Sequence, residues 1–412
     1  MFQFYIQIHI VYSMKHRVLI VNKFYYNRGG DCIAAINLEN LLKANGYEVA
    51  FFAMKYPENF ESEYSQYFVP QIDFSGGIAA KIAAAKRIFG FGDVANRFEK
   101  IIRDFRPDVV HLNNIHSYLS PIVAKIAKRH HCRVVWTLHD YKLLCPSYSC
   151  LRDNASCELC FHCKSRVLKL RCMKNSLAAS ALAYLEALRW NRKVLERYTD
   201  AFICPSRFMA LKMTSGGFTP DKLKVLCNFV DPVKLDRFRN MPVANRQPYY
   251  CYVGRLSQEK GVATMLEAAS QLPYELRVAG DGPLAAQLRS RYAHCANIRF
   301  LGRLDADGVS SLLGEARFSV IPSECYENNP LGVIESLCAG TPVVGARNGG
   351  IPELINQKSG IIFTPKDVND LKNAIIQAFC HPWDHSAIKA DALRLFSPEQ
   401  HLSQLKSIYE QS

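Results

Sequence analysis

Residues 324–344, ECYENNPLGVIESLCAGTPVV, decide the fold of this 412-residue chain. The apolar run just before them, residues 318–322, is short and rich in apolar side chains, which predicts a buried parallel strand. From Leu331 the apolar positions recur at helical spacing, and a Gly-Thr-Pro turn ends that helix before a second apolar run at residues 343–346. The stretch therefore predicts strand, loop, helix and strand, the repeating unit of an open parallel α/β sheet.

The loop at residues 326–330 would lie at the carboxyl end of a strand and lead into the amino terminus of a helix. Unpaired backbone N–H groups and the helix dipole favour an anion at such a place. Two carboxylates flank it, Glu327 in the loop and Glu335 in the helix. Because carboxylates accept hydrogen bonds from hydroxyl groups, this pattern fits a phosphorylated ligand that also carries a sugar or ribose. An ordinary strand–helix crossover with solvated acids is the alternative interpretation.

A second motif follows the apolar run at residues 249–253. Gly254 and Gly261 bound a loop in which Arg255 and Lys260 can converge on one diphosphate. Arginine offers a planar fork of donors and lysine a point charge. A pair of opposite unit charges about 4 Å apart gains roughly 4 kcal/mol at an effective dielectric constant of about 20. Two unconnected surface cations are the alternative, which the bounding glycines make less favourable.

Glycine turns end two further predicted strands. Residues 18–21 are followed by Gly29 and Gly30 and then a helix, which is how a Rossmann domain begins, although the GxGxxG fingerprint of NAD-binding proteins is absent. Gly280 and Gly282 form a similar turn later in the chain. Glycines allow a ligand to approach the backbone closely, and a plain tight turn is the alternative for each pair.

With these motifs the chain resembles the retaining glycosyltransferases of family four, whose mark is two glutamates separated by seven residues with a proline-containing loop between them. Glu327 and Glu335 stand at these positions. The resemblance covers nearly the whole chain from Met14 and is strongest over residues 250–363. It implies the GT-B fold, an α/β fold in which two Rossmann-like doubly wound parallel-sheet domains face each other across a cleft.

The resemblance also implies roles for these residues. Arg255 and Lys260 would bind the diphosphate of a nucleotide-diphosphate sugar and stabilise it as it leaves, while Glu327 orients the sugar hydroxyls and Glu335 the ribose. His139 lies where a predicted strand gives way to a loop and would face the donor sugar, with His116 as a rival candidate. The other donor-binding positions would be Gly29, Gly30, Gly254, Gly280, Gly282, Asn328, Asn329, Pro330 and Leu331.

By the same resemblance the attack is front-face: the departing phosphate takes the acceptor proton, without an enzyme nucleophile and without a catalytic metal. Residues 305–307 spell Asp-Ala-Asp, the DxD pattern of metal-dependent transferases of the other major fold. We reject that interpretation because Asp307 is predicted to be the N-cap of a helix.

A segment crowded with cysteines, residues 145–172, interrupts the first domain. Its spacing suits thiolate coordination, so we expect a structural zinc or iron–sulfur clip beside the acceptor cleft. Two separated CxxC pairs are missing, so free thiols are the alternative. The candidate ligands are Cys157, Cys160, Cys163 and Cys172.

Length and composition predict two domains. We expect an extension at residues 1–13 with Met14 as a candidate start, and a long helix at residues 176–198. The predicted divisions are an acceptor domain at 14–230, a linker at 231–248, a nucleotide-sugar domain at 249–382, and a tail at 383–412 that packs back on the first domain.

The net charge of +14 and the pI near 9.1 predict an anionic partner: nucleic acid, an acidic membrane or a phosphorylated small molecule. Residues 78–91 have a basic amphipathic pattern that would suit an anionic membrane, with an ordinary solvated helix as the alternative. No later stretch is long and apolar enough to span a bilayer. We therefore expect a cytoplasmic protein, with peripheral contact at the inner membrane face as an option.

These observations predict a retaining glycosyltransferase that moves a sugar from a nucleotide-diphosphate sugar to a saccharide or lipid-linked acceptor, in cell-surface polysaccharide or lipopolysaccharide synthesis. A nucleotide-sugar epimerase or a phosphorylase on the same fold is the rival among enzymes. From another class, a non-catalytic protein that binds an anionic ligand or nucleic acid is the alternative. No basic stripe with interleaved aromatic residues supports nucleic acid as a partner.

Overall fold

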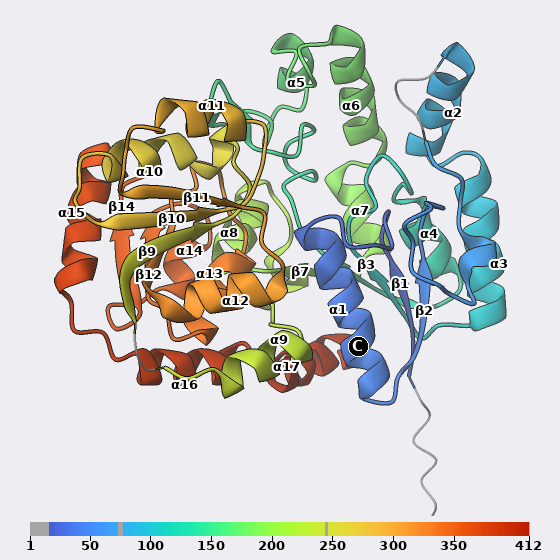
Figure 1. Ribbon diagram of the computed structural model, residues 1–412. Helices are drawn as coiled ribbons and strands as arrows, with labels where there is room; N and C mark the ends of the chain where they lie inside the picture. Colours follow the sequence, from blue (N-terminus) through green and yellow to red (C-terminus); the bar gives the residue numbers. More distant parts are fainter. Residues whose placement is uncertain (1–15, 73–76, 244–245, 412) are drawn as a thin grey trace, which may run out of the picture.

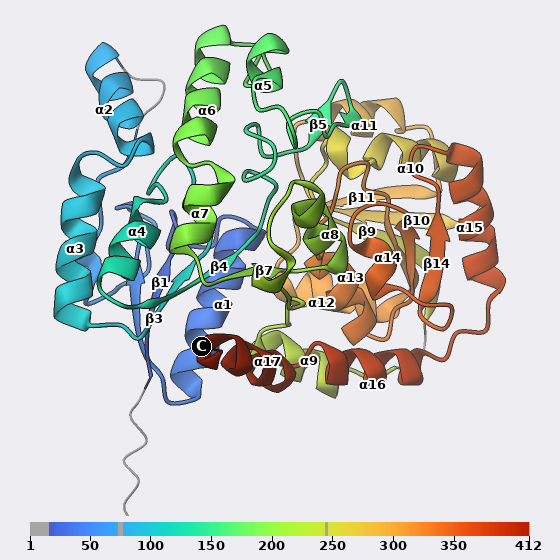
Figure 2. The same ribbon diagram turned by 180° about the vertical axis from the view of Figure 1, so that it is seen from behind.

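The computed structural model describes residues 16–72, 77–243 and 246–411 of the chain. Within them, two six-stranded parallel sheets with helices on their faces form two domains side by side (Figure 1, Figure 2). The predicted α/β class is confirmed. The predicted extension at residues 1–13 and the candidate start at Met14 lie outside the described residues.

The first sheet has the strand order β2-β1-β3-β4-β7-β8. Its inner strands are almost wholly buried because helices cover both faces, which is why they read as unbroken apolar runs. The strands are β1 (Arg17–Val21), β2 (Glu48–Phe52), β3 (Val109–Leu112), β4 (Arg133–Thr137), β7 (Ala201–Cys204) and β8 (Leu223–Val225). The helices are α1 (Gly30–Ala44), α2 (Ile78–Ile88), α3 (Asp93–Phe105), α4 (Ile122–Arg129), α6 (Leu177–Arg189), α7 (Arg192–Tyr198) and α8 (Arg207–Ser215). A small insertion holds β5 (Leu151–Arg152), β6 (Ala155–Ser156) and α5 (Arg166–Lys169).

The second sheet has the order β11-β10-β9-β12-β13-β14, which is the Rossmann order 3-2-1-4-5-6. Its strands are β9 (Gln247–Val253), β10 (Glu275–Ala279), β11 (Ile298–Gly302), β12 (Ala316–Ile321), β13 (Val343–Ala346) and β14 (Gly360–Phe363). Its helices are α9 (Pro232–Asn240), α10 (Val262–Ala269), α11 (Ala285–Arg291), α12 (Ala306–Glu315), α13 (Leu331–Cys338), α14 (Ile351–Leu354), α15 (Val368–Cys380) and α16 (His385–Leu395).

In each sheet the strand order reverses next to the first strand, between β1 and β3 in one and between β9 and β12 in the other. Ligands of open α/β sheets bind outside the carboxyl ends of the strands at this switch point. The loops after β1, β9 and β12 carry Gly29, Gly30, Arg255, Lys260 and Glu327, whereas His139 follows β4 and Gly280 and Gly282 follow β10.

Two predictions about helices are wrong in their detail. The helix expected at residues 176–198 is broken after Trp190, because the side chain of Asn191 accepts a hydrogen bond from Val194 N at 3.3 Å and starts a new helix, α7. Asp305, not Asp307, caps α12: its Oδ1 accepts from Gly308 N at 2.8 Å. Asp307 pairs instead with Arg237 at 2.8 Å.

The segment between the sheets is more ordered than a linker. Helix α9 occupies much of residues 231–248, and its Leu235 and Phe238 lie in the core of the second domain. After α16, which packs on α13, the chain crosses back and forms α17 (Pro398–Glu410). Leu405 and Tyr409 of α17 lie in a core cluster of the first domain, so the last helix joins the two domains (Figure 2).

The basic face predicted at residues 78–91 is wrong at Arg87. This guanidinium is buried and donates to both carboxylate oxygens of Asp93, at 2.8 and 3.0 Å, and to Pro70 O at 2.8 Å. Ile88 is buried as well, so this end of α2 faces protein. In the part of the chain that the structure describes, no helix is long and apolar enough to cross a membrane.

Candidate active site

The centre of the site in the second domain is an ion pair between Lys260 and Glu327. Lys260 ends a short 3-10 turn after β9, and Glu327 lies in the loop after β12. Lys260 Nζ is 2.6 Å from Glu327 Oε1, and Ser323 Oγ donates to the same oxygen at 2.7 Å. Burial alone would lower the pKa of Lys260, but the Glu327 carboxylate outweighs it and the pKa is raised. Lys260 is therefore a cation held in place by the Glu327 side chain.

Arg255 lies five residues before Lys260 in the same loop, and its side chain is exposed. Across residues 16–72, 77–243 and 246–411, the structure gives it no ion-pair partner. It is thus a cation free to meet a ligand phosphate at the mouth of the loop.

The glycines predicted to bind the donor fall into two groups. A Cβ on Gly280 would lie 1.9 Å from Gly254 O, and one on Gly282 would lie 2.5 Å from Leu256 O. These glycines allow the loops after β9 and β10 to pack together. Around Gly30, by contrast, a Cβ would meet nothing within 4 Å, and the Gly29 N-cap leaves the start of α1 without a side-chain cap. The N–H groups at that helix start are open to a ligand.

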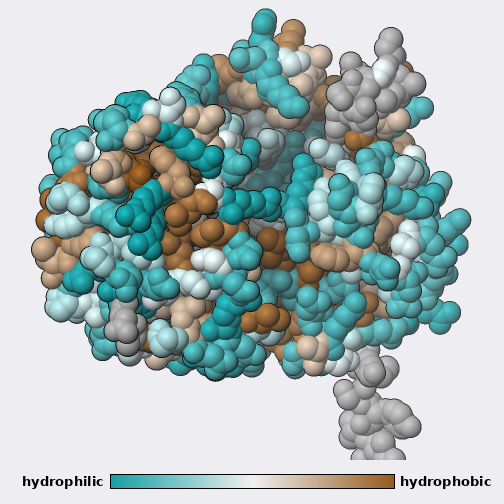
Figure 3. Space-filling view, in the orientation of Figure 1, coloured by the Kyte–Doolittle hydropathy of each residue, from teal (hydrophilic) through white to brown (hydrophobic). Residues whose placement is uncertain are grey.

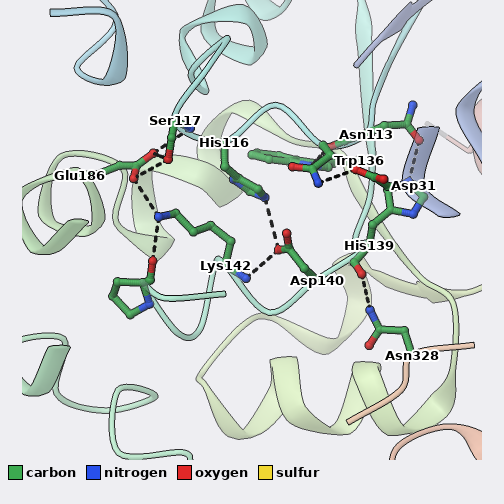
Figure 4. Close-up of polar contacts among 12 residues, drawn as sticks. Asp31, Asn113, His116, Ser117, Trp136, His139, Asp140, Lys142, Glu186 and Asn328 are labelled. Carbon is green, nitrogen blue, oxygen red and sulfur yellow. Dashed lines mark hydrogen bonds and ion pairs between the residues drawn. The ribbon is translucent and has the colours of Figure 1, made fainter. Parts of the chain in front are cut away.

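The loop after Glu327 links the domains. Asn328 Nδ2 donates to His139 O at 2.8 Å (Figure 4). Asn329 Oδ1 accepts from Asn228 N at 3.0 Å. Pro330 is the N-cap residue of α13 and Leu331 is its first residue. The tip of α13 is therefore placed against the first domain by hydrogen bonds from both asparagines.

Glu335 lies one turn further along α13 and is held by Lys234 of α9, with Nζ 2.5 Å from Oε1. Lys234 is about one-third exposed and Glu335 less so, at 32% and 16% of the side chain. The carboxylate is thus positioned by Lys234, and a ligand hydroxyl that binds it must share it with that ammonium group.

In the first domain His139 donates a hydrogen bond from Nε2 to Asn113 Oδ1 at 2.9 Å. Burial lowers the pKa of His139, so the imidazole is neutral near pH 7. It lines a cavity of about 30 Å³ together with Leu331 at the tip of α13. A cavity of this size holds about one water molecule.

His116, the rival candidate, lies in a different environment. Its ring stacks on Trp136 with centroids 5.3 Å apart, and its Nε2 is 3.8 Å from Asp140 Oδ1 (Figure 4). It lines a separate cavity of about 230 Å³, whereas His139 shares a cavity with the helix that carries Glu335. The structure therefore puts only His139 in the cavity that Leu331 lines, and its preference over His116 as a site residue stays a prediction.

Two family models match the chain. "Glycosyltransferase Family 4" covers residues 33–234, and "Glycosyl transferases group 1" covers residues 247–381. The chain belongs to the retaining family 4 glycosyltransferases.

Named relatives of this glycosyltransferase agree with the assignment. The sulfoquinovosyl transferase SQD2 of Arabidopsis thaliana is 32% identical over 43% of the chain, which spans 37% of that relative's length. An uncharacterized 42.6 kDa protein in the cps region of Klebsiella pneumoniae is 24% identical over 86% of the chain and 91% of its own length. Among solved structures, Anabaena HepE in complex with UDP-glucose has a TM-score of 0.62 at 17% identity, covering 96% of this chain and 100% of that one. This confirms the GT-B fold.

Reasoning from sequence missed a polar cluster next to His139 in this glycosyltransferase. Asp31, in the first turn of α1, accepts from Asn114 Nδ2 at 2.7 Å, and Lys23 is largely buried beside it. Burial alone would raise the pKa of Asp31, but His139 and Lys23 outweigh it and the pKa is lowered. The signal was available, because Asp31 directly follows the glycine pair and Asn113 and Asn114 directly follow a predicted strand.

The cysteine segment does not form the expected ligand set. Among the residues the structure describes, no group of three or more His, Cys, Asp or Glu side chains is arranged to hold a metal ion. Cys163 is exposed, with Sγ 3.2 Å from Ser165 Oγ, whereas Cys160 is buried and Cys157 and Cys172 are half-buried. Cys160 lies beside Cys145, which also contacts Cys150, so the thiols gather around Cys145, and the metal clip stays a prediction.

Proposed function

We propose that this glycosyltransferase moves a sugar from a nucleotide-diphosphate sugar to a hydroxyl of a saccharide or lipid-linked acceptor, with the anomeric configuration retained. The observation that carries the proposal is the charged Lys260–Glu327 pair beside the free cation Arg255, at the switch point of the second sheet. Asn328 joins this loop to the backbone of His139, so the donor side and the acceptor side meet at one place.

The chemistry assigned to these residues is electrostatic. Negative charge develops on the leaving diphosphate as the bond to the sugar breaks. Arg255 and Lys260 stabilise that charge, assisted by the loop amides near Asn328 and Asn329. The departing phosphate oxygen accepts the proton of the attacking hydroxyl, so no enzyme nucleophile takes part. Glu327 and neutral His139 orient the sugar.

The pathway is part of the proposal. The gene region named for the Klebsiella relative and the sulfoquinovosyl transfer named for the Arabidopsis relative support an acceptor in cell-surface polysaccharide, lipopolysaccharide or lipid glycosylation. We place the reaction in the cytoplasm, at the inner membrane face where such acceptors are presented. The UDP-glucose complex of HepE makes UDP-sugars the first donors to test.

The test is a panel of nucleotide sugars incubated with the purified protein, with nucleotide diphosphate release as the measurement. We expect release from one donor or a few, and loss of that release in Arg255→Ala. Arg299→Ala is the matched control, because its guanidinium is exposed and lies on β11 outside the loop. No release from any donor, with or without a mixed saccharide and lipid acceptor fraction, would refute the proposal. A rearranged nucleotide sugar without acceptor would indicate an epimerase instead.

A further inference from the structure

Helix α6 buries polar side chains and exposes leucines, the reverse of an ordinary surface helix in a soluble domain. Its buried positions are Ser180, Ala183 and Glu186. Glu186 faces inward, where it accepts from Ser117 N and Oγ at 3.0 Å and pairs with Lys142 at 2.9 Å (Figure 4). The polar side of the helix is therefore the one that packs on the domain.

Leucines occupy the opposite side of α6. Leu177, Leu185 and Leu188 are 53%, 48% and 48% exposed. Their spacing places them on one face of the helix. Burying a leucine side chain contributes about 1.5–3 kcal/mol, and here three leucines on one helix lack that contribution. An apolar face of this kind indicates an apolar partner.

The neighbouring helix α2 extends this surface. Trp190, just after α6, donates through Nε1 to Ile88 O at 2.8 Å, which holds the ends of the two helices together. Ile82 and Phe91 at α2 are exposed as well. Helices α2, α5 and α6 project from the same end of the first domain, and the tip over α5 and α6 shows mixed hydrophobic and hydrophilic side chains (Figure 1, Figure 3).

Cations lie on the neighbouring α5 segment and at the end of α6. Between residues 164 and 189 the only acidic residue is Glu186, which is turned inward. In the described parts of the chain the exposed cations of this segment form no ion pairs. They are Arg166, Lys169, Arg171, Lys174 and Arg189. A lysine or arginine close to an anionic lipid surface contributes about 1 kcal/mol to binding.

We propose that this face of α5 and α6 is the surface by which the enzyme docks on an anionic membrane. The exposed leucines match the acyl chains of an anionic bilayer, and the neighbouring unpaired cations match its charged headgroups. A second copy of the chain fits less well, because a symmetric contact would place like charges against each other.

The surface of α5 and α6 is connected to the donor site. Its role in bringing the enzyme to a lipid-linked acceptor rests on the proposed function. Glu158, in the segment that leads to α5, accepts from Tyr326 Oη at 2.8 Å in the donor loop. Lys212 of α8 pairs with the same carboxylate at 2.5 Å. Docking through α5 and α6 thus places the mouth of the cleft near the lipid surface, where a lipid-linked acceptor lies.

The test is co-sedimentation of the full chain with vesicles. We expect binding to phosphatidylglycerol–phosphatidylcholine vesicles and little binding to pure phosphatidylcholine. The double variant Leu185→Glu, Leu188→Glu should weaken binding by about a hundredfold or more, since the loss of each leucine costs at least about tenfold in insertion. The triple variant Lys169→Glu, Arg171→Glu, Lys174→Glu should weaken it as well, as should high salt. Leu395→Glu, on α16 and 52% exposed, is the matched control and should bind like the wild type.

Absence of wild-type binding to anionic vesicles, or equal losses in Leu395→Glu and the double variant, would overturn the proposal. Concentration-dependent dimers in sedimentation velocity that the double variant abolishes would assign the face to self-association instead. Nucleotide diphosphate release from a free donor should be unchanged in the double variant, with an unchanged circular dichroism melt. Failure of docking is then distinguishable from failure of the proposed transferase function.

Discussion

The two walls of the cleft hold their polar groups in opposite ways. In the second domain Lys260 and Glu327 are charged and partly open, at 33% and 14% exposure of the side chain. In the first domain burial lowers the pKa of His139 and raises that of Asp140, so the neutral forms are favoured. Figure 3 shows the hollow between the domains. We call its two sides the charged wall, after the Lys260–Glu327 pair, and the neutral wall, after His139, and we expect the first to stabilise developing charge and the second to position the sugar.

The largest effect should come from the charged wall. Arg255→Ala and Lys260→Ala should each lower kcat by about 10²–10³-fold, because removal of one preorganised group that stabilises a transition-state charge costs that much. The measurement is kcat at saturating donor, with Arg299→Ala as the control. Normal turnover in both variants would remove the charged wall from the mechanism and break the comparison.

The buried ion pair between Lys142 and Glu186, in the first domain, should affect stability and not chemistry. Glu186→Gln leaves Lys142 with no charged partner in a pair that is 9% and 8% exposed. Breaking a buried pair by removing one charge costs about 3–5 kcal/mol. We expect a urea unfolding free energy lower by about 3 kcal/mol, with KM for the donor nearly unchanged. The double variant Lys142→Met, Glu186→Leu should recover most of that loss, and a double variant as unstable as the single one would contradict the explanation.

The contrast between the walls also explains what the sequence revealed. Lys260, Glu327 and Glu335 lie in strand–loop–helix units whose local spacing predicts their place, so the charged wall was predictable. The neutral wall depends on contacts between distant segments, such as Asn328 with His139 O, which no local pattern contains. The contact of Glu353 could not be predicted from local sequence either. Its carboxylate accepts from Arg207 N at 2.8 Å, at the start of α8 in the other domain.

Local patterns also fail where two residues can serve one role. Asp305 and Asp307 are both suitable caps, and only the path of the chain into α12 selects Asp305. Arg87 suits a solvated basic face, but the neighbouring Asp93 and Pro70 O provide enough hydrogen bonds to bury it. The cysteine spacing suited a metal at Cys157, Cys160, Cys163 and Cys172, but the fold of the insertion puts the Cys160 thiol beside Cys145, which spacing alone does not determine.

Acid should destabilise the neutral wall. His401 of α17 bonds through Nδ1 to Cys227 O at 2.9 Å, and burial lowers its pKa to about 4. The unfolded chain has the ordinary value of about 6.5, so unfolding takes up a proton between about pH 6.5 and pH 4. The free energy of unfolding should therefore fall as the pH decreases through this window, by about 2 kcal/mol between pH 7 and pH 5 from His401 alone. Urea unfolding of wild type and His401→Gln at both pH values measures it, and equal pH dependence of the two proteins would contradict the assignment.

Substitution of Glu335 tests whether all residues of the charged wall act on the same part of the donor. Its carboxylate is held by Lys234, not by a group at the diphosphate site, so it should act on the nucleoside end of the donor. Glu335→Gln keeps the shape of the side chain and weakens hydrogen bonds from ribose hydroxyls, each of which contributes about 1.5–3 kcal/mol when the acceptor is charged. We expect KM for the donor to rise about tenfold with kcat nearly unchanged, the pattern of an interaction made equally in the ground and transition states. Lys234→Met is the companion variant: it frees the carboxylate, so it should not reproduce the rise in KM if Glu335 itself contacts the ribose. A fall in kcat without a change in KM would give Glu335 the same role as Arg255 and Lys260. The charged wall would then act as a single charge-stabilising unit.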